Sequence, residues 1–193
     1  MEMKTMRTGL AFVCLSLALG TAGCGSSPSS SALTPTALGA KYKVSATDIT
    51  GWQLDPADPN AFQVLDESTS KNLVTLIDGG AGAYTDRGCT VTIYQSLVGP
   101  NGEIAGPVYA MDFGTAANAT TMFNYSKDSY SATDTVPGFD ASVAIGHAAL
   151  VSVTVFAHFG AMYFEMTLSG FSDQTAAYQG AAQFLNVFKS RTN

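Results

Sequence analysis

The sequence predicts an α+β domain built on an antiparallel β-sheet of about five strands, with packed helices that include an amphipathic C-terminal helix. Three observations carry this prediction. About 150 residues follow the N-terminal region, which is a common size for a single domain with one core. Short β-rich segments are separated by clusters of turn residues. The expected elements follow one another through local hairpins with few crossovers.

Each element is predicted from its own periodicity or composition. Apolar residues recur every three or four positions in the helical segments, and β-branched or aromatic residues dominate the strands. The turn Gly99-Pro100-Asn101-Gly102 indicates a hairpin between two of these strands. In chain order we expect a helix at 66–77, strands at 90–98 and 107–113, a helix at 115–128, strands at 141–146, 148–156 and 161–168, and a helix at 173–191.

The C-terminal segment 173–191 has the clearest helical pattern. Asp173 is a suitable N-cap, and Lys189 and Arg191 suit the negative end of the helix dipole. Its apolar stripe consists of Ala177, Tyr178, Ala181, Phe184, Leu185 and Phe188. The strand before it alternates apolar and polar residues, as a strand with one buried face does.

The N-terminus predicts export. Residues 1–23 place Lys4 and Arg7 before an uncharged apolar run at 10–19, which is the pattern of a secretory signal peptide. A spanning helix needs about 20 apolar residues, so this run is too short to remain as a membrane anchor. Small residues then lead into Cys24, as a signal peptidase requires.

The segment Thr21-Ala22-Gly23-Cys24 resembles the lipobox of bacterial lipoproteins. This resemblance implies that a lipid on Cys24 anchors the protein to a membrane in the cell envelope. The usual lipobox has Leu where this chain has Thr21, so cleavage without lipidation stays an alternative. In that class the residue after the cysteine influences sorting, and Gly25 favours the outer membrane if the organism is Gram-negative.

A tether is predicted between the anchor and the domain. Residues 24–40 contain Gly, Ser, Pro, Thr and Ala with no charge, and such a chain buries too little apolar surface to offset its ordering entropy. The r.m.s. reach of a linker of this length is ~20 Å or more. The single globular domain is therefore expected to comprise residues 41–193.

Charge and cysteine content restrict the partners and the redox chemistry. The chain has 9 basic and 15 acidic residues, and its scattered lysines and arginines exclude a nucleic-acid partner and disfavour binding to anionic headgroups. Cys14 leaves with the signal and Cys24 would be acylated, so the mature domain keeps Cys89. We expect no intramolecular disulfide, and we expect Cys89 to be a buried small apolar residue rather than a reactive thiol.

Two segments carry a further resemblance. They are Asn72–Tyr84 (NLVTLIDGGAGAY) and Val108–Phe123 (VYAMDFGTAANATTMF). These segments resemble an uncharacterised family of exported bacterial proteins with an I-N-G-G-A-E-x-Y segment and a V-Y-D-M-G-[ST]-x-x-N-A-x-x-[MI]-[FY] segment. The chain has Asp78 and Gly82 where that family has Asn and Glu. The resemblance implies a shared fold and no particular activity.

Few residues suggest catalysis or metal binding. Ser68 and Lys71 fit an S-x-x-K pair, but the K-T-G and S-D-N partner motifs are missing, so a capping role for the serine is favoured. His147 and His158 have no metal-ligand spacing, although Asp112 or Glu165 could complete a weak site with them. We therefore predict no catalytic, cofactor or metal site.

Three other patterns could indicate a ligand site, but we favour a structural interpretation of each. An oxygen-rich loop lacks the glycine and the spacing of a calcium loop, and the segment 78–82 lacks the G-K-[ST] ending of a phosphate cradle. The aromatic residues are numerous enough to line a ligand groove but usually form core. The acidic loop comprises Asp55, Asp58, Asn60, Asp66 and Glu67, and the aromatic set comprises Trp52, Tyr84, Tyr94, Tyr109, Tyr125, Tyr130, Phe156, Phe159, Tyr163 and Phe171.

Two functional hypotheses follow. The first is a non-enzymatic envelope module that binds a partner protein, a glycan or a small ligand, and the lack of clustered titratable groups favours it. The alternative is a hydrolase or thiol enzyme of unrecognised type that uses Ser68 and Lys71, Cys89, or His147 and His158. No cofactor is expected under the first hypothesis.

Overall fold

The fold is built on an antiparallel sheet of seven strands, two more than the sequence predicts. The structure is a computed structural model that describes residues 33–149 and 152–192. Its strands are β1 (Gln53–Leu54), β2 (Phe62–Asp66), β3 (Val91–Val98), β4 (Ile104–Asp112), β5 (Val143–Ala149), β6 (Ser152–Phe159) and β7 (Met162–Ser169). Its helices are α1 (Pro35–Tyr42), the 3₁₀ turn η1 (Leu73–Thr75), α2 (Gly82–Thr85), α3 (Ala116–Asp128) and α4 (Gln174–Thr192). The α+β prediction is confirmed.

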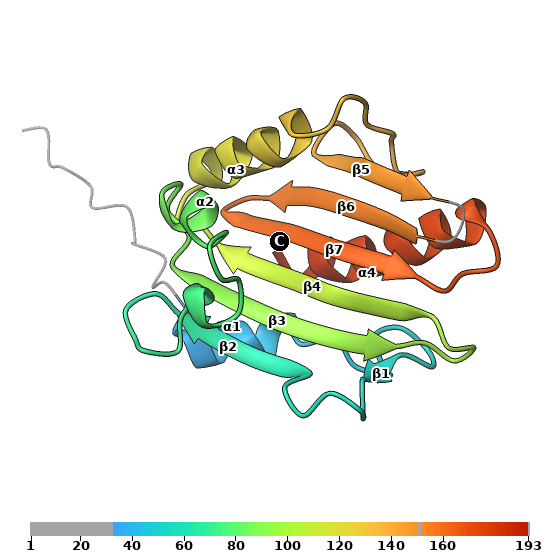
Figure 1. Cartoon of the computed structure of the whole chain (residues 1–193), viewed down its shortest axis with the longest axis horizontal. Helices are drawn as coiled ribbons and strands as arrows, with labels where there is room; N and C mark the ends of the chain where they lie inside the picture. The colour runs from blue at the N-terminus through green and yellow to red at the C-terminus, as the bar shows by residue number, and fades with distance from the viewer. Residues whose placement is uncertain (1–32, 150–151, 193) are drawn as a thin grey trace, which may run out of the picture. The chain divides into compact units, whose positions relative to one another are not determined.

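The strands lie in the order β1-β3-β4-β7-β6-β5, and β2 also pairs with β3 (Figure 1). Neighbouring strands of the sequence form hairpins, as expected, whereas β4 pairs with β7 across a long stretch of chain. Helix α3 belongs to that intervening stretch. The β4–β7 pairing therefore places residues from distant parts of the sequence side by side at the middle of the sheet.

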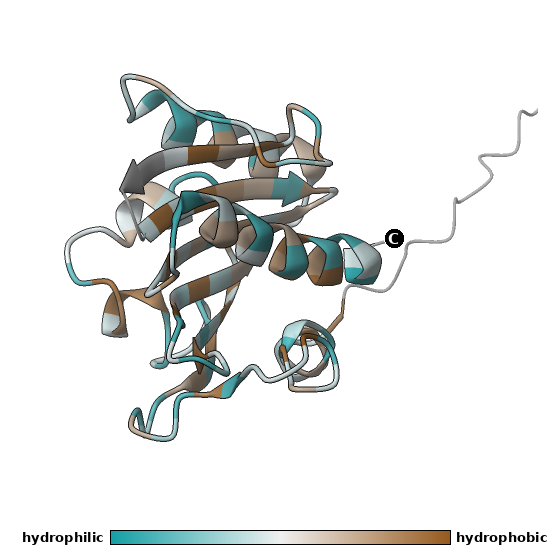
Figure 2. Ribbon diagram, turned by 90° about the vertical axis from the view of Figure 1, so that its right-hand side faces the viewer, coloured by the Kyte–Doolittle hydropathy of each residue, from teal (hydrophilic) through white to brown (hydrophobic). Residues whose placement is uncertain are grey.

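The helices divide between the two faces of the sheet. Helices α1 and α4 lie behind the sheet in Figure 1, and we call the face that they cover the rear face. Helices α2 and α3 pack on the other side, the front face, near one end of the strands. In Figure 2, α4 carries both apolar and polar segments, as an amphipathic helix does. Each face consequently has its own hydrophobic cluster.

The rear cluster is the larger one, and aromatic rings of β7, α4 and the segment before β1 meet in it. Phe164 stacks on Phe188 with ring centroids 4.6 Å apart, and Trp52 meets Phe184 edge-on at 4.9 Å. The predicted stripe of α4 is confirmed in five of its six members, because Tyr178 is half-buried while the others are buried. Asp173 caps this helix as predicted, since its carboxylate accepts the Ala176 amide at 2.8 Å.

The front cluster packs α3 and the segment before β3 against the sheet. Helix α3 forms where it is predicted. The spacing of its residues places Ala117, Thr121, Met122 and Tyr125 near one face, but of these only Met122 is buried. The buried face instead consists of Ala119, Met122, Phe123 and Ser126.

The predicted helix at 66–77 is wrong. Asp66 ends β2 opposite Val91, and its carboxylate accepts the amide of Ser68 at 2.9 Å and the Ser68 hydroxyl at 2.7 Å. These hydrogen bonds form a polar turn in place of a first helical turn. Leu73 still reaches the core and is fully buried, from the short turn η1.

The predicted tether at 24–40 extends too far into the chain. Residues from Pro35 form helix α1, which Thr34 caps by accepting the Ala37 amide at 3.3 Å. Leu38 and Tyr42 are buried against the rear cluster, so contacts with the domain supply the stability that composition alone does not indicate. Cys24 and the rest of the predicted signal and tether lie outside the described residues.

Across the described ranges, the helices are too short or too polar to cross a membrane.

Candidate functional site

A row of side chains crosses the front face at mid-strand. Tyr94 of β3 lies opposite Tyr109 of β4, which lies opposite Glu165 of β7, which in turn lies opposite Phe156 of β6. Directly paired residues of antiparallel strands point to the same face, with β-carbons about 5 Å apart. The register therefore places one carboxylate between tyrosine and phenylalanine rings on central strands.

Glu165 is held by two tyrosine hydroxyl groups, one from its own strand β7 and one from helix α2. Its Oε2 atom accepts the hydroxyl of Tyr163 at 2.8 Å and the hydroxyl of Tyr84 from α2 at 3.1 Å. The Tyr163 oxygen is also hydrogen-bonded to Ser126 of α3 at 2.7 Å. Because the single Tyr163 proton goes to the carboxylate, the Ser126 hydroxyl is the donor of that bond. Helices α3 and α2 are thus both linked to β7 by hydrogen bonds that lead to one oxygen of Glu165.

Burial sets the protonation behaviour of this cluster. It raises the pKa of Glu165, and it outweighs the opposing effect of the two tyrosine hydrogen bonds. Burial and then the negative charge of Glu165 raise the pKa of Tyr109 to about 12. The pKa values of Tyr84 and Tyr163 are raised for the same two reasons. The tyrosines consequently stay protonated near neutral pH and act as donors.

Aromatic rings border the carboxylate on both sides. The centroids of Tyr94 and Tyr109 are 5.9 Å apart, and Tyr130 packs on Phe156 at 5.4 Å. Tyr94 and Tyr130 are half-buried, as is Glu165 itself, so this part of the front face is accessible from outside. We call Tyr84, Tyr94, Tyr109, Tyr130 and Glu165 the Glu165–tyrosine face.

Glu165 has no cationic partner among the described residues. Among the described residues, the salt bridge joins Arg191 to Asp48, on the rear side of the sheet. Arg87 is the cation of the neighbouring α2 region, and its guanidinium lies over the Tyr125 ring at 3.6 Å and donates to the carbonyl of Ala83. The charge of Glu165 is therefore balanced by hydroxyl dipoles alone.

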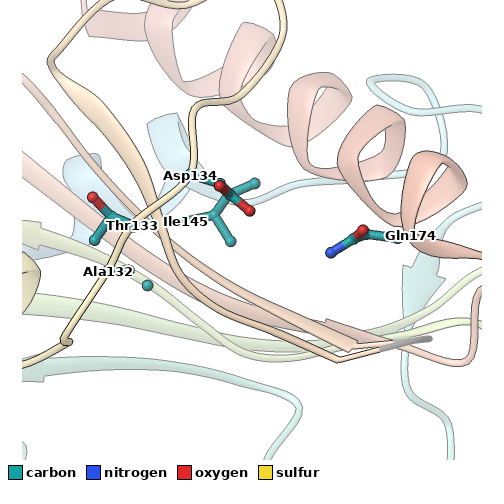
Figure 3. Close-up of a pocket in the computed structure, with 6 residues that line it drawn as sticks. Ala132, Thr133, Asp134, Ile145 and Gln174 are labelled. Atoms are coloured by element: carbon teal, nitrogen blue, oxygen red, sulfur yellow. The ribbon is translucent and has the colours of Figure 1, made fainter.

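Three hollows of the described surface are lined by residues other than those of the Glu165–tyrosine face. One of about 170 Å³ lies between the loop before β5 and the start of α4, and Figure 3 shows Asp134 and Gln174 on two sides of it. Its polar groups are already paired, since Tyr178 donates to Asp134 at 2.8 Å and accepts from Gln174 at 3.2 Å. This hollow has the character of a structural crevice.

Two larger hollows of about 360 and 250 Å³ adjoin each other along α4. They share Thr50 and Gln183, and Trp52 forms part of the floor of the smaller one. Both are open to solvent. Burial acts to raise the pKa of Asp48, which lines one of them, but hydrogen bonds from Ser45 and Arg191 lower that pKa overall, and hydrogen bonds from Asn101 likewise lower the pKa of Glu103, which lines the other. We call this second region the α4 hollow.

Cys89 is buried, as predicted. Its thiol is in hydrogen-bonding contact with the Thr92 hydroxyl at 3.4 Å, and burial raises its pKa to about 12. A thiol with this pKa stays protonated near neutral pH and is a poor nucleophile. The packing of Cys89 in the front cluster agrees with a core role.

The other candidate catalytic groups are not brought together. Ser68 donates its hydroxyl to Asp66 at 2.7 Å, and Lys71 is exposed. His158 is half-buried with its ring 5.0 Å from that of Phe123, and burial lowers its pKa. The side chain of His147 lies outside the described residues. Within the described residues, no three His, Cys, Asp or Glu side chains are grouped as metal ligands.

The acidic loop folds into turns. The carboxylate of Asp55 accepts the Ala57 amide and that of Asp58 accepts the Asn60 amide, each at 2.8 Å. Asp58 also accepts the Tyr94 hydroxyl at 3.4 Å, which brings a second carboxylate to the edge of the Glu165–tyrosine face. The local turns agree with the structural interpretation of this loop.

The role of Glu165 is the feature that sequence reasoning missed. Its alternation with Phe164 and Met166 indicates an outward-facing strand residue, and from the sequence it is expected only as a neighbour of a histidine. One signal is present in the sequence, because β7 carries a single charge and the chain has 8 tyrosines. The convergence of Tyr84 and Tyr163 on this charge depends on the tertiary structure.

Comparison with known proteins does not assign this chain to a family. No family model and no curated protein matches the chain. A solved structure, the extracellular domain of PknH from Mycobacterium tuberculosis, is similar with 15% identity and a TM-score of 0.48, over 81% of this chain and 97% of that one. A likeness of this degree carries no inference about function.

Proposed function

We propose that the chain is an exported lipoprotein, anchored through Cys24, whose domain is a non-enzymatic binding module. The Glu165–tyrosine face is the proposed binding surface. The observation that carries the proposal is the placement of a half-buried carboxylate without a cationic partner among partly exposed aromatic rings. A titratable group with a raised pKa on an accessible face is a candidate for a functional site.

The proposed anchor keeps this surface near a membrane. Eleven positions separate Cys24 from Pro35, where helix α1 begins, and that length spans at most about 40 Å when fully extended. A domain on so short a connection samples only the layer next to the lipid surface. Its ligand would therefore be a component of the envelope or a solute that passes through it.

The anchor is tested by the intact mass of protein extracted from membranes. The expected result is a chain that starts at Cys24 and carries a diacyl or triacyl mass. A Cys24→Ala variant should appear in the soluble extracellular or periplasmic fraction. A bare mature chain from the wild-type sequence would contradict lipidation and leave cleavage by an ordinary signal peptidase.

The binding surface is tested by a ligand screen that reports position. Envelope extracts and a library of small solutes are titrated into isotope-labelled protein, and NMR shifts of the tyrosine rings are followed. We expect shifts at Tyr94 and Tyr109 that disappear in a Tyr94→Leu variant and persist in a Gln183→Ala variant of the α4 hollow. Shifts confined to the α4 hollow, or turnover that a point mutation abolishes, would overturn the proposal.

A further inference from the structure

We propose that the Glu165–tyrosine face recognises an organic cation, namely a ligand that presents an ammonium group. This inference rests on the proposed function, because it assumes that this face is the binding surface, and it adds the chemical class of the ligand. Three independent features of the face support it.

The first feature is the missing positive charge. A carboxylate that is withdrawn from water loses solvation that a nearby cation normally replaces. The two hydroxyls of Tyr84 and Tyr163 satisfy Oε2, and no described hydrogen bond uses Oε1 of Glu165. A ligand ammonium would supply both the charge and the donor that this carboxylate lacks.

The second feature is the aromatic border. Tyrosine faces attract ammonium groups through their quadrupole, and rings around a cation are the common means of holding quaternary amines. Tyr94 and Tyr109 lie in the row on one side of Glu165, and Tyr130 packs on Phe156 on the other side, with Tyr94 and Tyr130 as the accessible rings. Elsewhere the domain already uses this contact, because Arg87 lies 3.6 Å over Tyr125.

The third feature is the exclusion of other ligand classes. An anionic ligand would meet Glu165 and, at the edge of the face, Asp58. A divalent cation needs several oxygen ligands, whereas the described residues contain no cluster of three acidic or metal-binding side chains. A neutral ligand would leave the charge of Glu165 uncompensated. An ammonium group has none of these three disadvantages.

The test uses a pair of probes of equal shape. Choline and its neutral isostere 3,3-dimethylbutan-1-ol are titrated into the purified protein by calorimetry and by NMR of the tyrosine rings. We expect choline to bind at least about tenfold more tightly, which corresponds to about 1.4 kcal/mol. Butylamine and a Gly-Lys-Gly peptide, titrated in parallel, distinguish a quaternary amine from a primary amine and from a lysine side chain.

Matched variants assign the effect to one charge. Glu165→Gln keeps an oxygen that accepts both tyrosine hydroxyls but removes the charge, so it should lose the preference for choline. Glu103→Gln removes an exposed carboxylate that is bonded to Asn101, and it should leave binding unchanged. Thermal unfolding of both variants confirms that they are folded.

The outcomes separate this inference from the proposed function. Equal binding of choline and its isostere, or unchanged cation binding in Glu165→Gln, overturns the cation class while leaving the face as a binding surface. Binding of none of the four probes at the face also overturns it, and the library screen then decides the proposed function by itself.

Discussion

The two faces of the sheet are built on different principles. The rear face, under α1 and α4, is packed with apolar side chains such as Phe164, Phe184 and Phe188, all fully buried. The front face is covered by α2 and α3 near one end and carries a charged side chain in its middle row. One face therefore accounts for most of the hydrophobic stabilisation, and the other combines packing with exposed polar chemistry.

The polar residues of the two faces sharpen this contrast. Gln95 is fully buried at the rear, where its Nε2 donates to the Tyr42 carbonyl at 3.0 Å and its Oε1 accepts the Val44 amide at 2.6 Å. Both ends of that amide serve to dock the end of α1. Glu165 has comparable partners on one oxygen only. The Gln95 amide is thus satisfied by the fold, whereas Oε1 of Glu165 has no described protein partner and is not enclosed, so a group from outside can reach it.

The largest effect is expected at the rear. Phe164→Ala should lower the free energy of unfolding by about 3–5 kcal/mol, because it removes a buried ring and leaves a cavity against Phe188 and Tyr42. Chemical denaturation measures this change. Phe164→Leu is the matched control and should cost clearly less. An equal cost for both variants would show that ring stacking rather than cavity formation dominates.

The next effect concerns the spacing of the front face. A β-carbon at Gly146 would overlap the rings of Phe156 and Tyr130, so Gly146→Ala should destabilise the domain by about 1–3 kcal/mol and displace Tyr130. Gly82→Ala is the control, because the nearest described atom to its β-carbon is a flexible Asp86 oxygen at 3.9 Å. Thermal unfolding and the ring signals of Tyr130 provide the measurements. Unchanged Tyr130 signals in Gly146→Ala would mean that the backbone of β5 moves instead.

A smaller effect is expected from the hydroxyl network. Tyr163→Phe removes the donor to Glu165 and the acceptor of Ser126, and should cost about 1 kcal/mol because Tyr84 still donates to the carboxylate. Tyr94→Phe loses a long bond of 3.4 Å to Asp58 and should be close to neutral. Equal costs for the two variants in a denaturant titration would indicate that the network around Glu165 does not favour its charged form.

The sequence predicts the fold better than the site for a physical reason. Local patterns determine α4 with its Asp173 cap, the hairpin of β3 and β4, and the alternation of β7. The short strands β1 and β2 depend on pairing with β3, and helix α1 depends on packing against β2 and β3, so the residues of these elements carry little signal of their own. Strand propensity is largely a measure of such tertiary surroundings.

The candidate site depends on still longer-range contacts. Glu165 is 81 positions from Tyr84 and 56 from Tyr109 in the sequence, and the β4–β7 pairing that joins them follows no local rule. The buried state of Cys89 is, in contrast, predictable from its place at the start of a strand and is confirmed. The lipid anchor at Cys24 lies outside the described residues and stays a prediction.

The smallest effect is a pH dependence confined to the front face. Burial raises the pKa of Glu165 above its usual value of 4.5, so the folded state binds this proton more tightly than the unfolded state. Stability contributed by the protonated group is therefore present below pH 4.5 and declines as the pH rises through the higher pKa of the folded state. The groups that face Glu165 are Tyr84 of α2, Tyr109 of β4, Tyr163 of β7 and Tyr130 of the segment after α3, and their raised pKa values keep them neutral throughout this window.

Glu165→Gln isolates the contribution of Glu165 protonation to stability, since all other titrating groups are common to both proteins. The variant should gain stability relative to the wild type as the pH rises above 4.5, and the difference should level off once the wild-type carboxylate is ionised. Denaturant titrations at intervals between pH 4 and pH 8 measure the difference. A cationic ligand should reduce it, because a bound ammonium favours the ionised carboxylate and lowers its pKa. A stability difference that does not vary with pH would mean that the carboxylate is well solvated, and the contrast between the two faces would then rest on packing alone.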